Sequence, residues 1–270
     1  MPDQSTEFDT EYGRPGGEPL LLDVYHRETT PEADAARPAI ILIHGGGWFR
    51  GDKSKELVLA TRLVEEGYIV FVPDYRLAPD HPFPSGRDDV LAAGRWADDS
   101  AYLFDRRRVA FFGGSAGGNL SVEAGIATGR PSVSWSGIFG LEAIIEATDA
   151  TAATPTTQDL DAMRSADINQ TGRDDAFLRW VVLQEVGDDR GMLAAASTTR
   201  HATASTGPVY LANSLAEFVP LSDPAGMQLA LAAAGVASTL QLIPGTRHAE
   251  GYLEKAIGGT LEFLREALSV

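Results

Sequence analysis

A serine flanked by glycines is the residue of this chain best suited to nucleophilic chemistry. Ser115 stands at the centre of residues 113–117, which read GGSAG and fit the pattern G-x-S-x-G. An apolar run at residues 109–112 precedes the pattern, and a stretch of small residues follows it. A sharp turn between a strand and a helix exposes a serine hydroxyl, and flanking glycines let the backbone pass closely. Ser115 is therefore the predicted nucleophile, and an ordinary N-cap serine in a glycine-rich loop is the alternative.

A second glycine-rich turn could supply backbone hydrogen-bond donors. Residues 44–48 read HGGGW and follow the apolar run at residues 39–43. Glycines there let main-chain amides approach a carbonyl oxygen, so the predicted oxyanion-hole donors are the amides of Gly46, Gly47 and Ala116. A nucleotide-binding loop is the alternative, but the residues that follow complete neither the dinucleotide pattern nor the P-loop pattern.

One of five histidines must act as the general base if Ser115 is the nucleophile. His248 follows the last predicted strand, at residues 239–243, and comes after Ser115 in the chain. A base in that loop matches the chain order serine, acid, histidine that accompanies this kind of serine turn. We therefore predict His248 as the base; the other histidines are His26, His44, His81 and His201.

Alternating sequence patterns predict the elements that would position these residues. Short β-branched or aromatic runs alternate with helix-like stretches, which indicates an α/β fold with a mainly parallel sheet between helices. Predicted strands occupy residues 20–27, 39–43, 68–73, 109–112, 132–139, 209–212 and 239–243. Predicted helices occupy residues 53–66, 88–98, 116–127, 225–234 and 250–268. The length allows a single domain over residues 1–270.

One stretch interrupts this alternation. Residues 142–206 contain no strong strand, residues 148–157 are rich in Thr and Ala, and residues 174–186 have the pattern of an amphipathic helix. Because large apolar side chains are few, we interpret the stretch as an insertion, or lid, over the sheet edge rather than a second domain. Four apolar residues near strand ends are predicted to line a substrate pocket, with core packing as the alternative: Trp48, Phe49, Phe139 and Leu141.

Composition and charge exclude several chemistries and partners. The 270 residues include no cysteine, which excludes disulfides, thiol catalysis and cysteine-ligated metals. The formal net charge of −16 disfavours binding to nucleic acids and to anionic membranes. Apolar runs are too short to span a bilayer, and residues 1–19 lack the apolar segment of a secretory signal. We therefore expect a cytoplasmic protein.

Together these motifs resemble the α/β-hydrolase superfamily, and most closely its hormone-sensitive-lipase-like and feruloyl/acetyl-xylan-esterase-like carboxylesterases. Residues 73–79 (PDYRLAP), 81–84 (HPFP) and 51–53 (GDK) add to the resemblance. It implies a serine hydrolase that cleaves a small-molecule carboxylic ester with a small or medium acyl group, without metal or cofactor, as a monomer or homodimer. Three charged residues of this region are predicted to be buried and paired: Asp74, Arg76 and Asp89.

The position of the catalytic acid departs from the family pattern. These relatives commonly read Asp-x-x-Val-Pro, and counting back from Val219 and Pro220 places Ala216 where the aspartate is expected. Three hypotheses account for the alanine: an engineered Asp→Ala knockout, a substitute acid at Glu217 or Glu142, or a natural relative of low activity. Loss of the acid costs about 10⁴-fold in kcat in well-studied serine proteases, so we expect impaired activity if no substitute exists.

Other functions are compatible with the same residues. A formamidase, a lactonase or an acyltransferase would use this apparatus on another substrate. A ligand-binding relative would keep the fold without reacting. Turnover of p-nitrophenyl acetate against N-formylkynurenine separates the enzymes, and the reaction of Ser115 with a fluorophosphonate, also after Ala216→Asp, identifies a binding protein.

Overall fold

A computed structural model describes residues 4–149 and 170–269 of the chain. Its centre is an eight-stranded sheet in the order β1-β2-β4-β3-β5-β6-β7-β8. Strand β2 pairs antiparallel with β1 and β4, and the other neighbouring strands are parallel. The predicted α/β fold class is thus confirmed. The strands are β1 (Gln4–Gly13), β2 (Leu20–Arg27), β3 (Ala39–Ile43), β4 (Ile69–Pro73), β5 (Val109–Gly114), β6 (Ser132–Trp135), β7 (Val209–Ser214) and β8 (Ser238–Ile243).

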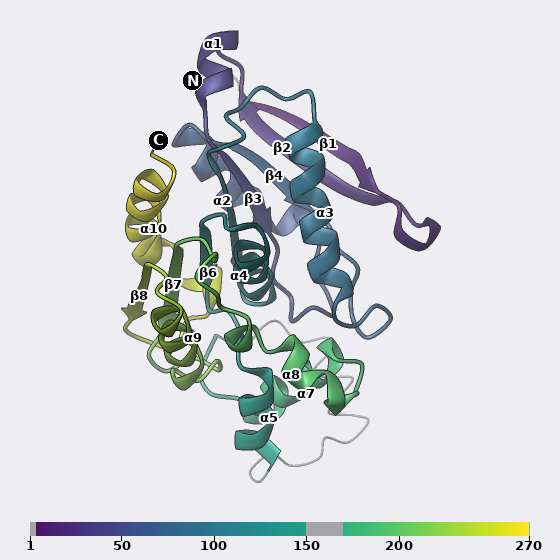
Figure 1. Cartoon of the computed structure of the whole chain (residues 1–270), viewed down its shortest axis with the longest axis vertical. Helices are drawn as coiled ribbons and strands as arrows, with labels where there is room; N and C mark the ends of the chain where they lie inside the picture. The colour runs from purple at the N-terminus through teal and green to yellow at the C-terminus, as the bar shows by residue number, and fades with distance from the viewer. Residues whose placement is uncertain (1–3, 150–169, 270) are drawn as a thin grey trace.

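Helices cover both faces of this sheet (Figure 1). Strand β3 shows how the sequence fills both layers. Ile41 and Ile43 belong to the core under α3 and α4, whereas Ile40 and Leu42 belong to the core under α2 and α10. A strand buried on both faces requires a continuous apolar run, which residues 39–43 provide. The covering helices are α2 (Leu57–Glu65), α3 (Ser85–Asp99), α4 (Ala116–Thr128), α9 (Ser222–Ala233) and α10 (Leu253–Ala267).

Two predicted elements have different boundaries in the structure, and one strand was not predicted. The helix predicted at residues 53–66 is divided into a 3-10 turn, η2 (Lys53–Glu56), and α2. The strand predicted at residues 132–139 ends at Trp135, because Ser136 turns the chain with a φ of 54°. Strand β1 was not predicted, since it is a polar edge strand that forms by pairing with β2.

The predicted insertion contributes helices to one end of the molecule. Within residues 142–206, the described part holds α7 (Asp175–Glu185), α8 (Leu193–Ala196) and most of α5 (Leu141–Asp149), and no strand. Figure 1 shows these helices gathered at the end opposite to α1 (Pro31–Ala36) and the two termini. The irregular segment predicted at residues 148–157 falls mostly outside the described residues.

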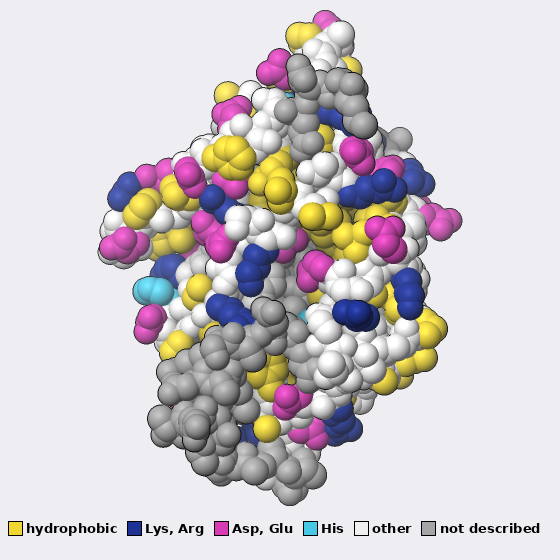
Figure 2. All heavy atoms as spheres, turned by 180° about the vertical axis from the view of Figure 1, so that it is seen from behind, with side chains coloured by type: hydrophobic (Ala, Val, Ile, Leu, Met, Phe, Trp, Pro, Cys, Tyr) yellow, Lys and Arg dark blue, Asp and Glu magenta, His cyan; other side chains and the backbone are white. Residues whose placement is uncertain are grey.

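Acidic and basic side chains are interspersed on the surface seen in Figure 2, so the net charge of −16 does not form a single-sign patch on this face. In the described part of the chain, every helix is too short or too polar to cross a membrane.

A partly buried ion pair ties the loop after β4 to α3. Asp89 is 3% exposed and accepts hydrogen bonds from Arg76 through its backbone N–H at 2.9 Å and its guanidinium at 2.8 Å. Asp74 accepts the backbone N–H of Lys53 at 2.8 Å, which holds the start of η2. The predicted pairing is confirmed for Arg76 and Asp89, of which only Asp89 is fully buried. Asp74 is half-buried and accepts a backbone N–H instead of pairing with a charged side chain.

We expect Asp89→Ala to lower the free energy of unfolding by about 3 kcal/mol, because Arg76 would lose the carboxylate that compensates its desolvation. Urea denaturation at pH 7 measures this change. Asp88→Ala removes an exposed carboxylate paired with Arg87 from the same helix turn, so it should cost less than about 1 kcal/mol. Equal losses in the two variants would contradict the structural role assigned to Asp89.

Candidate active site

Ser115 lies in the turn between β5 and α4, and its backbone has a φ of 57° and a ψ of −123°. A non-glycine residue in this region is strained, which is a feature of functional turns. Its N–H donates to Trp135 O at 2.7 Å and anchors the turn to β6. A Cβ on Gly113 would lie 2.4 Å from the backbone of Gly117, and a Cβ on Gly117 would lie 2.1 Å from Ile43 O. The glycines therefore permit the sharp turn that the motif predicts.

His248 lies in the loop between β8 and η5 (Ala249–Tyr252), and its side chain is 2% exposed. The ring packs on Phe218 with centroids 4.3 Å apart. Its Nδ1 is in hydrogen-bond contact with Oε2 of Glu217. Neither Nε2 of His248 nor the hydroxyl of Ser115 has a hydrogen-bond partner among the described residues. One ring nitrogen is thus held by a carboxylate, and the other can accept a proton.

Three turns meet at the carboxyl edge of the parallel strands. A Cβ on Gly114 would lie 3.1 Å from Cβ of Ala249 and 2.1 Å from Oε1 of Glu250. The segment from the end of β8 through η5, which we call the base loop, therefore touches the turn that carries Ser115. A Cβ on Gly45 would lie 3.4 Å from Cβ of Ser115, so the glycine turn touches it as well. The chain therefore brings the predicted nucleophile, base loop and oxyanion loop together.

Glu217 is a buried carboxylate, 3% exposed, and hydrogen bonds hold both of its oxygens. Its Oε1 accepts from the backbone N–H of Ser214 at 2.7 Å and from the hydroxyl of Ser136 at 2.8 Å. The Ser136 hydroxyl also accepts the N–H of Ala249 at 3.0 Å. Ser136 thus links the loop after β7, which carries Glu217 and which we call the acid loop, to the base loop. Sequence reasoning missed it, because a serine at a strand end carries no signal for this role.

The structure places the three candidate positions for the acid differently. Ala216 is exposed on the turn after β7. Glu142 lies at the start of α5 and pairs with Arg200, so the hypothesis that it serves as the acid is not supported. Of the carboxylates that the sequence suggested, Glu217 is the one that contacts His248. The turn exposes residue 216 and directs residue 217 inward.

The glycine turn between β3 and η2 adopts backbone conformations that favour glycine. Gly46 and Gly47 have φ values of 127° and 61°, and Trp48 follows with a φ of 62°. A Cβ on Gly46 would lie 1.9 Å from Arg50 O, which excludes any side chain there. Ala116 opens α4, where backbone N–H groups lack partners within the helix. The three residues of the predicted oxyanion hole thus belong to Ser115's own turn and to the glycine turn beside it.

His44 is a buried structural histidine. Its Nδ1 donates to Gly45 O at 2.8 Å, its ring stacks on Tyr75 with centroids 4.2 Å apart, and Tyr75 donates to His44 O at 3.0 Å. Burial lowers the pKa of His44 to about 4, from an ordinary value of 6.5. The ring is therefore neutral at pH 7 and holds the glycine turn in place.

Helix α7 of the insertion covers these turns with aromatic side chains. Trp180 packs edge-on against Phe49 with centroids 4.7 Å apart, and Phe177 packs against Phe218 with centroids 5.8 Å apart. Phe218 in turn contacts His248. Phe177 and Trp180 also contact each other, with centroids 6.1 Å apart, so a continuous series of rings runs from the glycine turn to the base.

The four residues predicted to line the pocket are distributed unevenly. Phe49 packs against Trp180 of α7, the helix that we call the roof of the site. Phe139 is fully buried against Met227 of α9, which corresponds to the core-packing alternative. Trp48 and Leu141 are each 1% exposed and lie in the main core.

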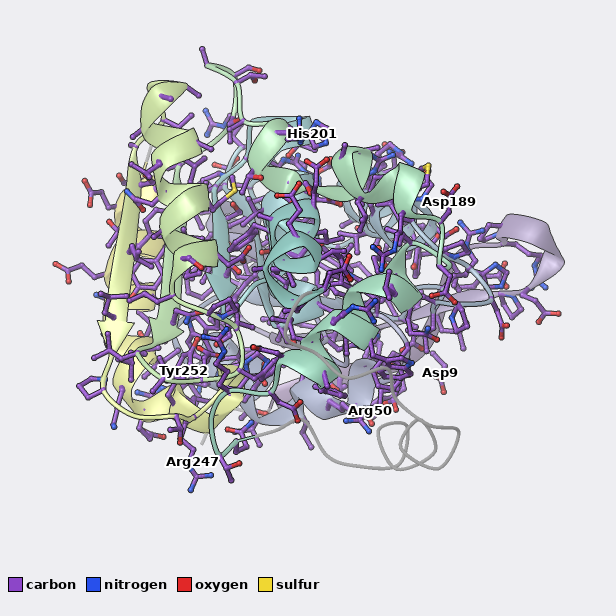
Figure 3. All side chains as sticks on the ribbon, turned by 90° about the horizontal axis from the view of Figure 1, so that it is seen from below. Asp9, Arg50, Asp189, His201, Arg247 and Tyr252 are labelled. Atoms are coloured by element: carbon purple, nitrogen blue, oxygen red, sulfur yellow. The ribbon has the colours of Figure 1, made fainter. Side chains whose placement is uncertain are left out.

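Figure 3 shows that His201 lies apart from the glycine turn and from the segment around His248. Arg50 at the end of the glycine turn, Arg247 next to His248, and Tyr252 at the end of η5 lie on one side of the molecule. His201 lies on the opposite side and contacts Ala195 O at 2.8 Å. The location of His201 is therefore unsuited to the role of base.

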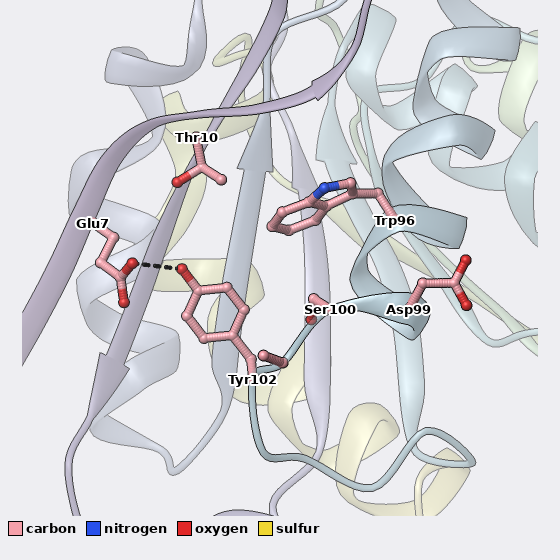
Figure 4. Close-up of a pocket in the computed structure, with 7 residues that line it drawn as sticks. Glu7, Thr10, Trp96, Asp99, Ser100 and Tyr102 are labelled. Carbon is pink, nitrogen blue, oxygen red and sulfur yellow. Dashed lines mark hydrogen bonds between the residues drawn. The ribbon is translucent and has the colours of Figure 1, made fainter.

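A cavity of about 550 Å³ lies away from this site. It is formed by β1 and the C-terminal end of α3, and the Tyr102 hydroxyl donates to Glu7 across it at 2.8 Å (Figure 4). The end of α3 lies at the amino edge of the strands, opposite to Ser115, because the helix runs antiparallel to them. The cavity is therefore separate from the candidate active site.

Comparisons with known proteins show which proteins this chain resembles in sequence and fold. A family model described as the alpha/beta hydrolase fold matches residues 40–251. Carboxylesterase NlhH of Mycobacterium tuberculosis is 34% identical over 229 residues, which are 82% of this chain and 68% of that protein. Versiconal hemiacetal acetate esterase of Dothistroma septosporum is 29% identical over 222 residues, 78% of this chain and 66% of that protein. The thermostable carboxylesterase EstE1, from a metagenomic library, superposes with a TM-score of 0.74 at 21% identity, over 99% of this chain and 90% of that one.

The lowered pKa of His44 predicts a loss of stability in acid. The unfolded state takes up this proton below about pH 6.5 and the folded state only below about pH 4, so stability falls as the pH falls between these values. From pH 7 to pH 5 the loss from this residue should be about 2 kcal/mol in the free energy of unfolding. His44→Asn keeps a donor for Gly45 O but does not titrate. In urea denaturation, the free energy of unfolding of this variant should therefore fall by about 2 kcal/mol less than that of the parent between pH 7 and pH 5.

The variant and the parent share the other buried acids, and the comparison cancels their contributions. Burial raises the pKa of Glu123 to about 7 and of Asp223 to about 6, which changes stability in the opposite direction. Identical pH dependence in the two proteins would show that His44 is not the residue responsible.

Proposed function

The chain belongs to the α/β-hydrolase-fold family, and on that premise we propose that it is a serine carboxylesterase of the hormone-sensitive-lipase type with Glu217 as its acid. The observation that carries the proposal is the buried contact between Glu217 and Nδ1 of His248, next to the strained turn of Ser115. The acid is one methylene longer than the family aspartate and one residue later in the loop. The other two hypotheses for Ala216 are not needed to explain how the histidine is oriented.

In the first step the Ser115 hydroxyl attacks the ester carbonyl carbon and gives its proton to Nε2 of His248. The electron pair of the carbonyl moves to its oxygen, where the amides of Gly46, Gly47 and Ala116 stabilise the negative charge. Glu217 stabilises the imidazolium through Nδ1 and does not take the proton itself.

In the second step the oxyanion collapses and the bond to the alcohol oxygen breaks. Nε2 of His248 protonates the leaving alcohol, and an acyl-enzyme remains on Ser115. A water molecule then gives a proton to Nε2 of His248 and attacks the acyl carbon. The bond between the acyl carbon and Oγ of Ser115 breaks, His248 returns the proton to this oxygen, and the carboxylic acid leaves.

The rings above the glycine turn favour a small or medium acyl group. A Cβ on Gly47 would lie 2.8 Å from the Phe49 ring and 3.2 Å from Val181, so side chains of the turn and of α7 crowd the space above the glycine backbone. The name of one relative, versiconal hemiacetal acetate esterase, also indicates a small acyl group on the substrate of that protein.

Removal of the nucleophile tests the proposed reaction. We expect the protein to hydrolyse p-nitrophenyl acetate and to be labelled by a fluorophosphonate, and Ser115→Ala to lose the label and about 10⁶-fold in kcat. Rapid cleavage of N-formylkynurenine with negligible ester turnover would contradict ester hydrolysis. No labelling of Ser115, even after Ala216→Asp, would instead favour a binding protein.

Variants of the acid loop test the role of Glu217. Glu217→Gln keeps the size of the side chain but removes its charge, so we expect kcat to fall by about 10³- to 10⁴-fold. Ala216→Asp should change kcat by less than about threefold, because Glu217 already holds Nδ1 of His248. Steady-state kinetics on p-nitrophenyl acetate measures both. A rise of several orders of magnitude in Ala216→Asp would mean that the acid is missing, and the assignment of Glu217 would fail.

A further inference from the structure

Residues 170–172 lie between the loops that carry the acid and the base. The Thr246 hydroxyl of the base loop donates to Gln170 O at 3.0 Å. A Cβ on Gly172, whose φ is 131°, would lie 3.3 Å from Ala216 O and 3.7 Å from Cγ2 of Thr246. The same short segment therefore contacts both loops and then leads into α7.

The side chain of Gln170 makes two hydrogen bonds with the main chain of His248. Its Oε1 accepts the N–H of His248 at 2.9 Å, and its Nε2 donates to the carbonyl oxygen of His248 at 3.2 Å. The two backbone groups have opposite polarity, so only one orientation of the amide satisfies both. The Gln170 amide therefore holds the main chain of His248 by two hydrogen bonds, from the side of the insertion.

Gly251 leaves the space that the Gln170 side chain occupies when it makes these hydrogen bonds. A Cβ at position 251 would lie 2.2 Å from Oε1 of Gln170. The φ of Gly251 is not in the positive region, so the space rather than the backbone conformation requires a glycine. A methyl group here would push the Gln170 amide off His248 without changing Gln170 itself.

The base loop has little burial of its own to hold it. Pro244, Gly245 and Arg247 are exposed, whereas His248 is buried. Glu217 and Phe218 orient the imidazole ring, but they do not fix the main chain from which it projects. Hydrogen bonds to that main chain therefore decide where Nε2 lies relative to Ser115, and a misplacement of about 1 Å can cost about 10²-fold in rate.

We propose that Gln170 is a positioning residue that couples the insertion to the catalytic base; this inference rests on the proposed esterase function. Asp174 caps α7 by accepting the N–H of Phe177 at 3.0 Å, and Phe177 and Trp180 lie in the roof. One continuous piece of chain thus contacts the main chain of His248 and also carries the aromatic rings of α7. Rearrangement of that piece would change the rate of catalysis as well as access to the site.

Kinetics of two single variants and their combination test the proposal. Gln170→Ala should lower kcat on p-nitrophenyl acetate by about 10- to 100-fold, with KM changed less than about threefold, because the base and not the pocket is displaced. Gly251→Ala should give a similar loss. The double variant should be no worse than either single variant, because both changes remove the same contact.

Gln228→Ala is the matched control. Gln228 also donates its amide to a main-chain carbonyl, that of Ser238 at 3.3 Å, but between α9 and β8. This variant should keep kcat within about twofold of the parent, and melting temperatures of all four variants should show that each is folded. A kcat for Gln170→Ala equal to that of the control, or additive losses in the double variant, would overturn the proposal.

A readout independent of turnover separates this inference from the proposed function. Hydrogen exchange of the His248 amide should be at least about tenfold faster in Gln170→Ala than in the parent, since its acceptor is lost. Unchanged exchange would overturn the proposed role of Gln170, even if the protein is an active esterase. If exchange is accelerated but the parent protein hydrolyses no ester, the role of Gln170 is supported and the proposed esterase function is wrong.

Discussion

The contact between the Glu217 carboxylate and the His248 imidazole is the constraint on which the rest of the site depends. Both side chains are almost completely buried, and a buried carboxylate is costly unless hydrogen bonds satisfy it. The N–H of Ser214 and the hydroxyl of Ser136 supply two of these bonds, and the imidazole supplies the third. The ends of β6 and β7 and the loop after β8 must therefore converge at one point.

The fold makes this convergence possible because the parallel strands end at the same edge of the sheet. Ser115 follows β5 at that edge, and the glycine turn follows β3, its neighbour. Glycines at the contact points let these turns approach to distances that a Cβ would forbid. The insertion then closes the site from outside through the rings of α7 and the amide of Gln170.

The sequence predicted the parts of this site that depend on local pattern and missed those that depend on contacts between distant segments. The motif around Ser115 and the order of strands and helices are local, and they led to the fold and to the two loops that flank the serine. The acid could not be placed by counting, because the course of the turn after β7 decides that residue 217 rather than 216 faces inward. Ser136 acts through hydrogen bonds to Glu217 and Ala249, which lie 81 and 113 positions away in the chain. Gln170 acts through His248, 78 positions away. No local sequence pattern reveals contacts over such separations.

The most direct test of the central claim is the proton on Nδ1 of His248. Solution NMR of the protein with ¹⁵N-labelled histidine should show a strongly downfield proton attached to this nitrogen, because a buried carboxylate accepts its hydrogen bond. The resonance should persist in Ala216→Asp and disappear in Glu217→Gln. Its absence from the parent protein, or its survival in Glu217→Gln, would contradict the assignment of Glu217 as the partner of the base.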